Sequence, residues 1–244
     1  MTTNFYAPPS ALRERRVVLP EAEARHLRTV LRAQEGEEMV VVNGEGGWYR
    51  VRIDHLTSDQ VVGTITEKRE DVGEPAIEVT VGLGILKKRS RFETFVEKAV
   101  ELGVRRIVPL RTRRTERSSI RKDRLRSVMV GAMKQCRRSW LPTLTAPQSP
   151  ESLAPASDAA AEFVCHSEDD AVPLHRAAGR ARPFDKALVL VGPEGGFADS
   201  EVEAAVSAGG TVVSLGPRRL RAETAGLAVL QALIGPAASE RAPN

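Results

Sequence analysis

Aromatic residues are scarce in this chain of 244 residues, at 4% of the sequence. A protein that binds single-stranded nucleic acid mainly by stacking bases needs more aromatic side chains, so the composition disfavours that class. The only cysteines are Cys136 and Cys165, which excludes a disulfide framework and a four-cysteine zinc site. The sequence also lacks an HExxH motif and a close pair of histidines. We therefore expect no metal site.

Long hydrophobic runs are missing as well. No apolar stretch approaches the ~18 residues that a membrane span needs, and the start, MTTNFYAPPSALRERR, has no apolar segment typical of a secretory signal. Hydrophobic residues make up 41% and charged residues 28% of the chain, as in ordinary globular proteins. We expect a cytoplasmic protein with reduced thiols and with one large or two small domains.

Charge is distributed unevenly along the chain. Residues 84–138 contain 18 Lys and Arg against 5 Asp and Glu, a local charge of +13 that leaves −9 for the rest of a chain with net charge +4. A basic run can simply be a solvated surface. Because the remainder is acidic, we interpret this segment as a surface for a polyanion, with nucleic acid as the favoured partner.

Residues 1–73 have the pattern of a small β-rich domain. Helical spacing of apolar residues predicts a helix over 21–32. In the stretch 39–53, strand patterns with alternating side chains flank a glycine-rich connection, which predicts a hairpin. The stretch 60–68 predicts a further strand. Several short strands indicate a small barrel, followed by a linker at 69–75.

Residues 74–236 alternate between strand and helix patterns, which predicts an α/β fold with a parallel sheet. The last residues, 237–244, are expected to form a disordered tail. The predicted strands cover 77–86, 105–110, 161–166, 187–191 and 211–215, and the predicted helices cover 91–102, 118–138, 200–207 and 225–234.

Two glycine-containing loops follow apolar strands, LVLVGPEGGF at 188–197 and VVSLGPRRLRAETAG at 212–226. Ligands of parallel α/β sheets bind outside the carboxyl ends of the strands. Glycine tolerates a positive φ and lets backbone groups approach a ligand closely. The first loop lacks the lysine of a P-loop and does not match GxGxxG. The alternative interpretation is a purely structural turn between a strand and a helix.

Together these loops resemble the SPOUT-class RNA methyltransferases, specifically the bacterial 16S ribosomal RNA uracil-N3 methyltransferase family. The resemblance rests on GPEGG at 192–196 and LG-P-R-x-LR-x-ETA at 215–225, and extends to EKAVELGV at 97–104, QC-x-R at 135–138 and HLRTVLR at 26–32. It implies an N-terminal PUA-like β-barrel and a C-terminal SPOUT α/β domain with a deep trefoil knot. It further implies a homodimer that acts on 16S ribosomal RNA, within the small ribosomal subunit.

The resemblance also implies a site. S-adenosylmethionine would lie between the two loops, held by His166, Val191, Gly192, Gly195, Gly196, Leu215, Gly216, Leu220, Thr224 and Ala225. Glu223 would act as the base or orienter for uracil N3, with Arg221 or Arg138 stabilising the charge on the uracil. Contacts to RNA phosphates are assigned to Arg28, Arg32, Lys87, Lys88 and Arg89.

Several alternatives stay open at this stage. Arg221 and Glu223 could form a structural ion pair, and His166 could be structural. The chemistry could take place on another RNA or another atom, such as a ribose 2′-oxygen. A non-catalytic RNA-binding or ribosome-assembly protein that kept the fold would have the same pattern, but would not bind S-adenosylmethionine.

Four positions depart from the family pattern. Asn4 stands where the family commonly has an arginine, so one contact to RNA is not expected here. Lys134 and Arg137 stand where glutamate and glycine are usual, and both are expected to make the surface more basic. Ala198 replaces the serine before the helix that follows GPEGG. We therefore expect Ser200 and Glu203 to form a capping box for that helix.

Overall fold

The computed structural model describes residues 4–29, 31–57, 60–116, 119–166 and 171–238. The chain divides into two compact units. Unit 1 comprises 1–74 and 130–141, and unit 2 comprises 75–129 and 142–244. The sequence places a boundary after residue 73 but gives no sign that 130–141 packs with the N-terminal residues, because that segment continues a helical pattern.

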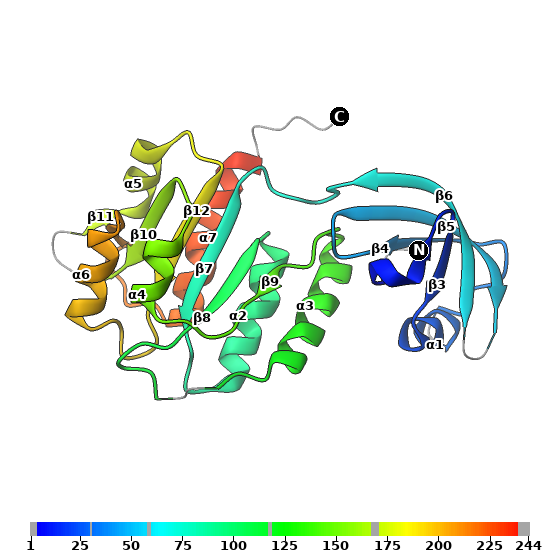
Figure 1. The fold of residues 1–244 in the computed structure, drawn as a ribbon, viewed down its shortest axis with the longest axis horizontal. Coiled ribbons are helices and arrows are strands. Elements are labelled where there is room, and N and C mark those ends of the chain that lie inside the picture. Colours follow the sequence, from blue (N-terminus) through cyan, green and yellow to red (C-terminus); the bar gives the residue numbers. More distant parts are fainter. Residues whose placement is uncertain (1–3, 30, 58–59, 117–118, 167–170, 239–244) are drawn as a thin grey trace. The chain divides into compact units, whose positions relative to one another are not determined.

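Unit 1 is built on a six-stranded sheet in the order β1-β4-β5-β6-β3-β2 (Figure 1). The predicted hairpin is confirmed as β4 and β5, and Asn43 Oδ1 fixes its turn by accepting hydrogen bonds from the N–H groups of Glu45 and Gly47, both at 2.8 Å. The strands are β1 (Phe5–Tyr6), β2 (Leu12–Arg13), β3 (Arg16–Leu19), β4 (Glu38–Val42), β5 (Gly47–Leu56) and β6 (Val61–Glu70).

The first helix, α1 (Glu21–Thr29), is shorter than the sequence predicts. Ala24 and Leu27 are buried as expected, whereas Val30 lies outside the described residues. Leu31 is 39% exposed and does not belong to the core. Arg32 has a φ of +50°, which an α-helix cannot accommodate, so the predicted end at residue 32 is wrong.

Helix α3 (Lys122–Cys136) ends in a left-handed turn. Arg137 has a φ of +62°, and the N–H of Arg138 donates to the carbonyl of Met133 at 3.1 Å. This is the Schellman arrangement, in which glycine is the preferred residue. Lys134, one turn earlier, pairs with Glu23 at 2.6 Å, with side chains 17% and 13% exposed. The expectation that Lys134 adds to a basic surface is therefore wrong.

Arg137→Gly should stabilise the protein. A non-glycine residue in the left-handed region costs about 1–2 kcal/mol, and the greater entropy of glycine in the unfolded chain offsets part of this cost. We expect the free energy of unfolding to rise by about 0.5–1 kcal/mol, measured by urea denaturation. The matched control is Gln135→Gly, inside α3, which should destabilise by about 0.5–1 kcal/mol. A loss of stability in Arg137→Gly would contradict this account of the turn.

Unit 2 contains a seven-stranded sheet in the order β11-β13-β10-β12-β7-β8-β9, and its strands are all parallel. This confirms the prediction of a parallel α/β fold. The strands are β7 (Glu78–Gly84), β8 (Arg106–Leu110), β9 (Thr143–Leu144), β10 (Ala161–Cys165), β11 (Val172–Pro173), β12 (Lys186–Val191) and β13 (Thr211–Ser214).

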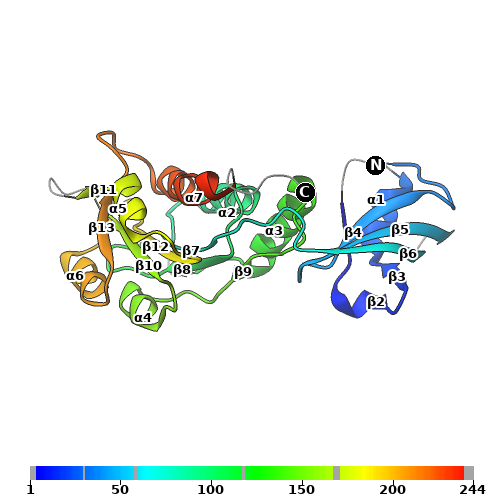
Figure 2. The ribbon, with the colours of Figure 1, turned by 90° about the horizontal axis from the view of Figure 1, so that it is seen from above.

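Helices cover both faces of this sheet (Figure 2). On one face α7 (Ala222–Ala238) packs against α2 (Arg89–Glu101) and α5 (Leu174–Ala181), and on the other α4 (Pro150–Leu153) packs against α6 (Asp199–Ser207). The predicted apolar face of α2, with Phe92, Phe95, Val96 and Ala99, is buried. No helix in the described part of the chain is long and apolar enough to cross a membrane.

Some boundaries in unit 2 differ from the predictions. The stretch 141–161, expected to be mostly loop, contains β9 and α4, and helix α5 was not predicted. Helix α7 starts at Ala222 and continues to Ala238, so the expected tail is helical at 237–238. The rest of the tail, 239–244, lies outside the described residues.

Candidate functional site

The carboxyl ends of β10, β12 and β13 surround a cavity of about 520 Å³. The strands end at Cys165, Val191 and Ser214, and because they are parallel their following loops meet at one edge of the sheet. Nine of the ten predicted cofactor residues line this cavity: His166, Val191, Gly192, Gly195, Gly196, Leu215, Gly216, Leu220 and Ala225. The tenth, Thr224, does not line it.

The loop 192–196 is shaped by close backbone packing. Among its glycines only Gly196 takes a positive φ, +71°. A Cβ on Gly192 would lie 2.9 Å from the carbonyl carbon of Gly196, too close for any side chain. Gly84, at the end of β7, also allows this close packing, although it lies outside the loop. A Cβ on Gly84 would overlap the ring nitrogen of Pro193. Sequence reasoning missed Gly84, because its contact joins distant parts of the chain.

Apolar side chains form part of the wall, with Val191, Val213, Leu215 and Leu220 among them. Cys165 also lines this cavity, and burial raises the pKa of its thiol to about 12. The thiol therefore stays protonated near neutral pH and is a poor nucleophile. The wall suits a flat, largely apolar group, and the volume lies in the ordinary range for small-molecule sites.

The rim of the cavity is strongly basic. Arg114, Arg218, Arg219 and Arg221 all line it, with Glu194 as the acidic member. Arg114 comes from the loop after β8, and its Nη1 donates to the carbonyl oxygen of Gly195 at 3.0 Å. Sequence reasoning assigned only Arg221 to this region. The adjacent Arg218 and Arg219 belong to the same sequence motif, but nothing in the motif predicted that they would line the cavity.

Glu223 lies in the first turn of α7, between the cavity-lining residues Ala222 and Ala225. Its side chain is 13% exposed, and its Oε1 is 3.6 Å from Nε of Arg91 on α2. Its Oε2 is buried without a hydrogen-bond partner in the described part of the chain. The structural alternative supposed an ion pair between Glu223 and Arg221. The structure pairs Glu223 with Arg91 instead. A buried, unsatisfied carboxylate oxygen is rare and is often explained by function.

The N-terminus of α6 is capped differently from the expectation. Glu201 is 1% exposed, and its Oε2 accepts the N–H of Ala198 at 2.7 Å. Its Oε1 accepts the N–H of Arg113 at 2.8 Å. The predicted capping box of Ser200 and Glu203 is therefore wrong, and one carboxylate links the start of α6 to the loop after β8.

Arg138 is not among the cavity residues. It belongs to unit 1, where its side chain is 3% exposed and its Nη2 pairs with Glu74 at 2.6 Å. Trp140 also donates its backbone N–H to Glu74, at 3.1 Å. This geometry gives Arg138 a structural contact within unit 1.

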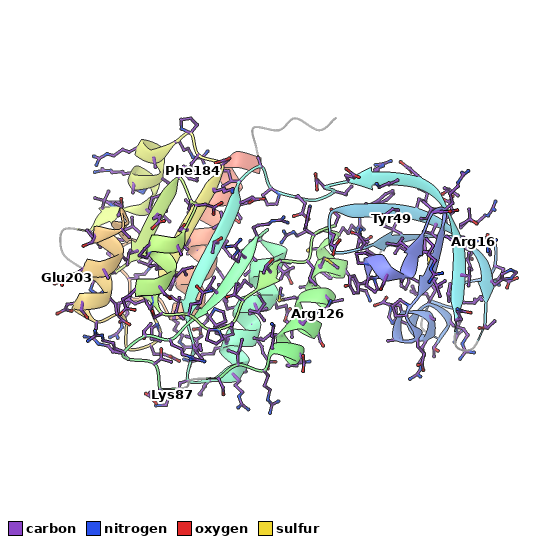
Figure 3. All side chains as sticks on the ribbon, in the orientation of Figure 1. Arg16, Tyr49, Lys87, Arg126, Phe184 and Glu203 are labelled. Atoms are coloured by element: carbon purple, nitrogen blue, oxygen red, sulfur yellow. The ribbon has the colours of Figure 1, made fainter. Side chains whose placement is uncertain are left out.

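The predicted phosphate contacts fall in both units. Arg28 and Arg32 are exposed residues of unit 1, at and after the end of α1. Lys87, Lys88 and Arg89 are exposed after β7 in unit 2, at the same edge of the sheet as the cavity. Figure 3 shows Lys87 projecting outward there, and its Nζ lies 2.9 Å from Glu116.

Comparison with known proteins gives two family matches. Residues 73–234 match the model of the RNA methyltransferase domain, and residues 19–66 match that of the RNA methyltransferase PUA domain. Ribosomal RNA small subunit methyltransferase E of Synechocystis is 31% identical, over 96% of this chain and 78% of the relative. The Bacillus subtilis protein of the same name is 26% identical, over 86% of each chain.

Two similar solved structures contain the cofactor. Ribosomal RNA small subunit methyltransferase E of Neisseria gonorrhoeae, bound to S-adenosyl methionine, has a TM-score of 0.84 and 28% identity, over 96% of this chain and 97% of that one. A methyltransferase of Legionella pneumophila in complex with SAM has a TM-score of 0.82 and 26% identity, over 97% and 98% of the two chains.

Proposed function

This chain belongs to the RNA methyltransferase family, and on that basis we propose that it transfers the methyl group of S-adenosylmethionine to N3 of a uridine in 16S ribosomal RNA. The observation that carries the proposal is the cavity formed by the loops after β12 and β13. The relatives that cover nearly the whole chain are named as small-subunit ribosomal RNA methyltransferases, and two similar structures hold the cofactor.

The residues of the cavity fit S-adenosylmethionine. Leu215, Leu220 and Val191 offer apolar surface for the adenine ring, and the glycine backbone of 192–196 leaves room for close approach. This ligand has no phosphate, in agreement with a glycine-rich loop that lacks a P-loop lysine. When bound, the cofactor supplies an electrophilic methyl group on a sulfonium.

The protein must supply proton removal and charge stabilisation. N3 of uracil carries a proton, and its removal leaves negative charge on the uracil carbonyl oxygens. Glu223 is the base or orienter, since one of its oxygens is buried without a partner in the described part of the chain and the other faces Arg91. Arg221, on the cavity wall, is the donor to the carbonyl oxygens. Because Arg138 is held by Glu74, we now prefer Arg221 for that role.

N3 lies on the Watson–Crick edge, so the target uridine must be unpaired or turned out of its helix. The basic rim of the cavity, together with Lys87, Lys88 and Arg89, provides a cationic surface for the surrounding backbone. Arg28 and Arg32 are exposed in unit 1, in a region that matches an RNA methyltransferase PUA domain, and we assign them separate contacts to RNA phosphates.

Binding of RNA should depend steeply on salt. Each phosphate neutralised by lysine or arginine releases counterions, so log affinity should fall linearly with log salt, with a slope of about −0.7 to −0.9 per phosphate. Filter binding of 16S ribosomal RNA from 50 to 400 mM potassium chloride measures this slope. An affinity that hardly changes over the series would rule out a mainly electrostatic interaction.

Finer features follow from the resemblance and remain part of the proposal. Residues 1–73 form a PUA-like barrel and 74–236 a SPOUT domain with a trefoil knot. After β13, which lies between β11 and β10, the chain returns as α7 to pack against β7 and α2, and this return supports such a threading. The functional form is a cytoplasmic homodimer, and its substrate is ribosomal RNA within the small subunit.

The direct test is methyl transfer in vitro. The protein is incubated with S-adenosylmethionine and, in parallel, with 16S ribosomal RNA transcribed in vitro or with small ribosomal subunits from cells that lack the gene, and the digested nucleosides are identified by mass spectrometry. We expect 3-methyluridine. The appearance of 2′-O-methyluridine would assign the enzyme to other chemistry. Failure to bind S-adenosylmethionine at micromolar concentrations would support a non-catalytic RNA-binding protein.

A further inference from the structure

Arg114 belongs both to the basic segment 84–138 and to the lining of the cavity. It lies in the basic segment, in the loop after β8, and it lines the cavity formed by the two glycine loops. Its guanidinium donates to the carbonyl oxygen of Gly195 at 3.0 Å. Its side chain also covers that glycine, since a Cβ built on Gly195 would lie 3.1 Å from Cβ of Arg114. The surface for RNA and the loop for the cofactor are therefore in direct contact.

The backbone around Arg114 is held in place. The N–H of Arg113 donates to the buried carboxylate of Glu201 at 2.8 Å, and the N–H of Thr112 donates to Oγ1 of Thr115 at 2.9 Å. Glu201 in turn accepts the N–H of Ala198, just beyond the glycine loop. These bonds fix the position of the Arg114 backbone over Gly195, whereas its exposed side chain stays accessible to a ligand.

The guanidinium of Arg114 has more N–H donors than its contact with Gly195 uses. It carries five N–H donors in a fixed planar fork, and the contact with Gly195 uses one nitrogen. The other donors can bind a phosphate in the bidentate manner for which arginine is suited. S-adenosylmethionine carries a positive sulfonium, so a rim with four arginines is better matched to the polyanion than to the cofactor.

We propose that Arg114 couples the two binding events, so that RNA tightens the binding of the cofactor and the cofactor tightens the binding of RNA. An RNA phosphate on Arg114 restricts the guanidinium to the orientation that also holds the Gly195 carbonyl. The second ligand then meets a loop that is already ordered and loses less conformational entropy. This inference rests on the proposed function, because it takes S-adenosylmethionine and RNA as the two ligands.

The test is a comparison of two neighbouring arginines. The affinity for S-adenosylhomocysteine, which cannot transfer a methyl group, is measured by calorimetry with and without 16S ribosomal RNA transcribed in vitro. In the parent protein we expect the RNA to tighten binding about tenfold, within the usual range of coupling between sites. Arg114→Ala should reduce this factor to less than about twofold, while its cofactor affinity without RNA falls only about threefold, as for one lost hydrogen bond.

Arg113→Ala is the matched control. Arg113 is exposed in the same loop and carries the same charge, but its side chain does not line the cavity. Arg113→Ala should weaken RNA binding about as much as Arg114→Ala does, because each variant removes one positive charge. At saturating RNA it should keep the factor by which RNA tightens the binding of S-adenosylhomocysteine. Equal coupling in the parent and Arg114→Ala, or an equal loss in both variants, would overturn the inference.

A parent protein that binds S-adenosylhomocysteine without any effect of RNA would overturn this inference alone and leave the proposed function standing. A parent protein that binds no S-adenosylhomocysteine would overturn both.

Discussion

Gly84→Ala is expected to weaken the binding of S-adenosylmethionine at least about a hundredfold, which corresponds to about 2.8 kcal/mol. The added methyl group would overlap the ring nitrogen of Pro193, and backbone atoms cannot move aside as a flexible side chain can. The loop 192–196 must shift as a whole, and the cavity that it encloses changes shape. Isothermal titration calorimetry with S-adenosylmethionine measures the effect.

The control for Gly84→Ala is Gly179→Ala on α5. A Cβ at Gly179 meets no heavy atom within 4 Å, so this variant should keep full cofactor affinity and gain about 0.5–1 kcal/mol of stability. Circular dichroism and a urea titration establish that both variants fold, since overpacking at Gly84 costs about 1–3 kcal/mol by itself. A folded Gly84→Ala protein with unchanged affinity would mean that loop 192–196 does not hold the cofactor.

Glu223→Gln should lower kcat about 10²–10³-fold, because removal of a proton by a positioned base contributes about 10²–10⁴-fold to a rate. Glutamine keeps the size of the side chain and removes its charge. The affinity for S-adenosylmethionine should change less than about threefold, since Glu223 does not line the cavity. Single-turnover methylation of 16S ribosomal RNA with saturating cofactor separates the two effects.

Glu203→Gln is the control for that experiment. Glu203 is exposed on the outer side of α6 (Figure 3), and the loss of its charge should leave both kcat and cofactor affinity unchanged. If Glu223→Gln retained the parent kcat, Glu223 would be only the structural partner of Arg91. Another group would then have to receive the proton of N3.

Local sequence patterns were sufficient to predict the elements around the cavity. Short apolar runs predicted β7, β10 and β12, and the helical spacing of Phe92, Phe95 and Val96 predicted the buried face of α2. The rule that ligands bind at the carboxyl ends of parallel strands then placed the two glycine loops at one edge. The structure brings nine of the ten expected cofactor residues to that edge.

Contacts between distant parts of the chain could not be predicted in this way. The overlap at Gly84, the pair of Arg91 with Glu223 and the bond from Arg114 to Gly195 each depend on the order of strands in the sheet. Periodicity carries no information on that order. Very short elements such as β9 and β11 leave no periodic signal either. Arg138 illustrates the same limit, because its motif gave no indication of its pairing with Glu74.

The most direct test of the central claim is to map the modification in cells. A methyl group on N3 blocks the Watson–Crick edge of uracil, so reverse transcriptase stops at the modified uridine. In 16S ribosomal RNA from the parent strain we predict one such stop that disappears when the gene is deleted. The stop should return with the parent gene and stay absent with Gly84→Ala. A deletion strain with an unchanged pattern of stops, or one that loses a ribose methylation instead, would contradict the assignment to uracil N3.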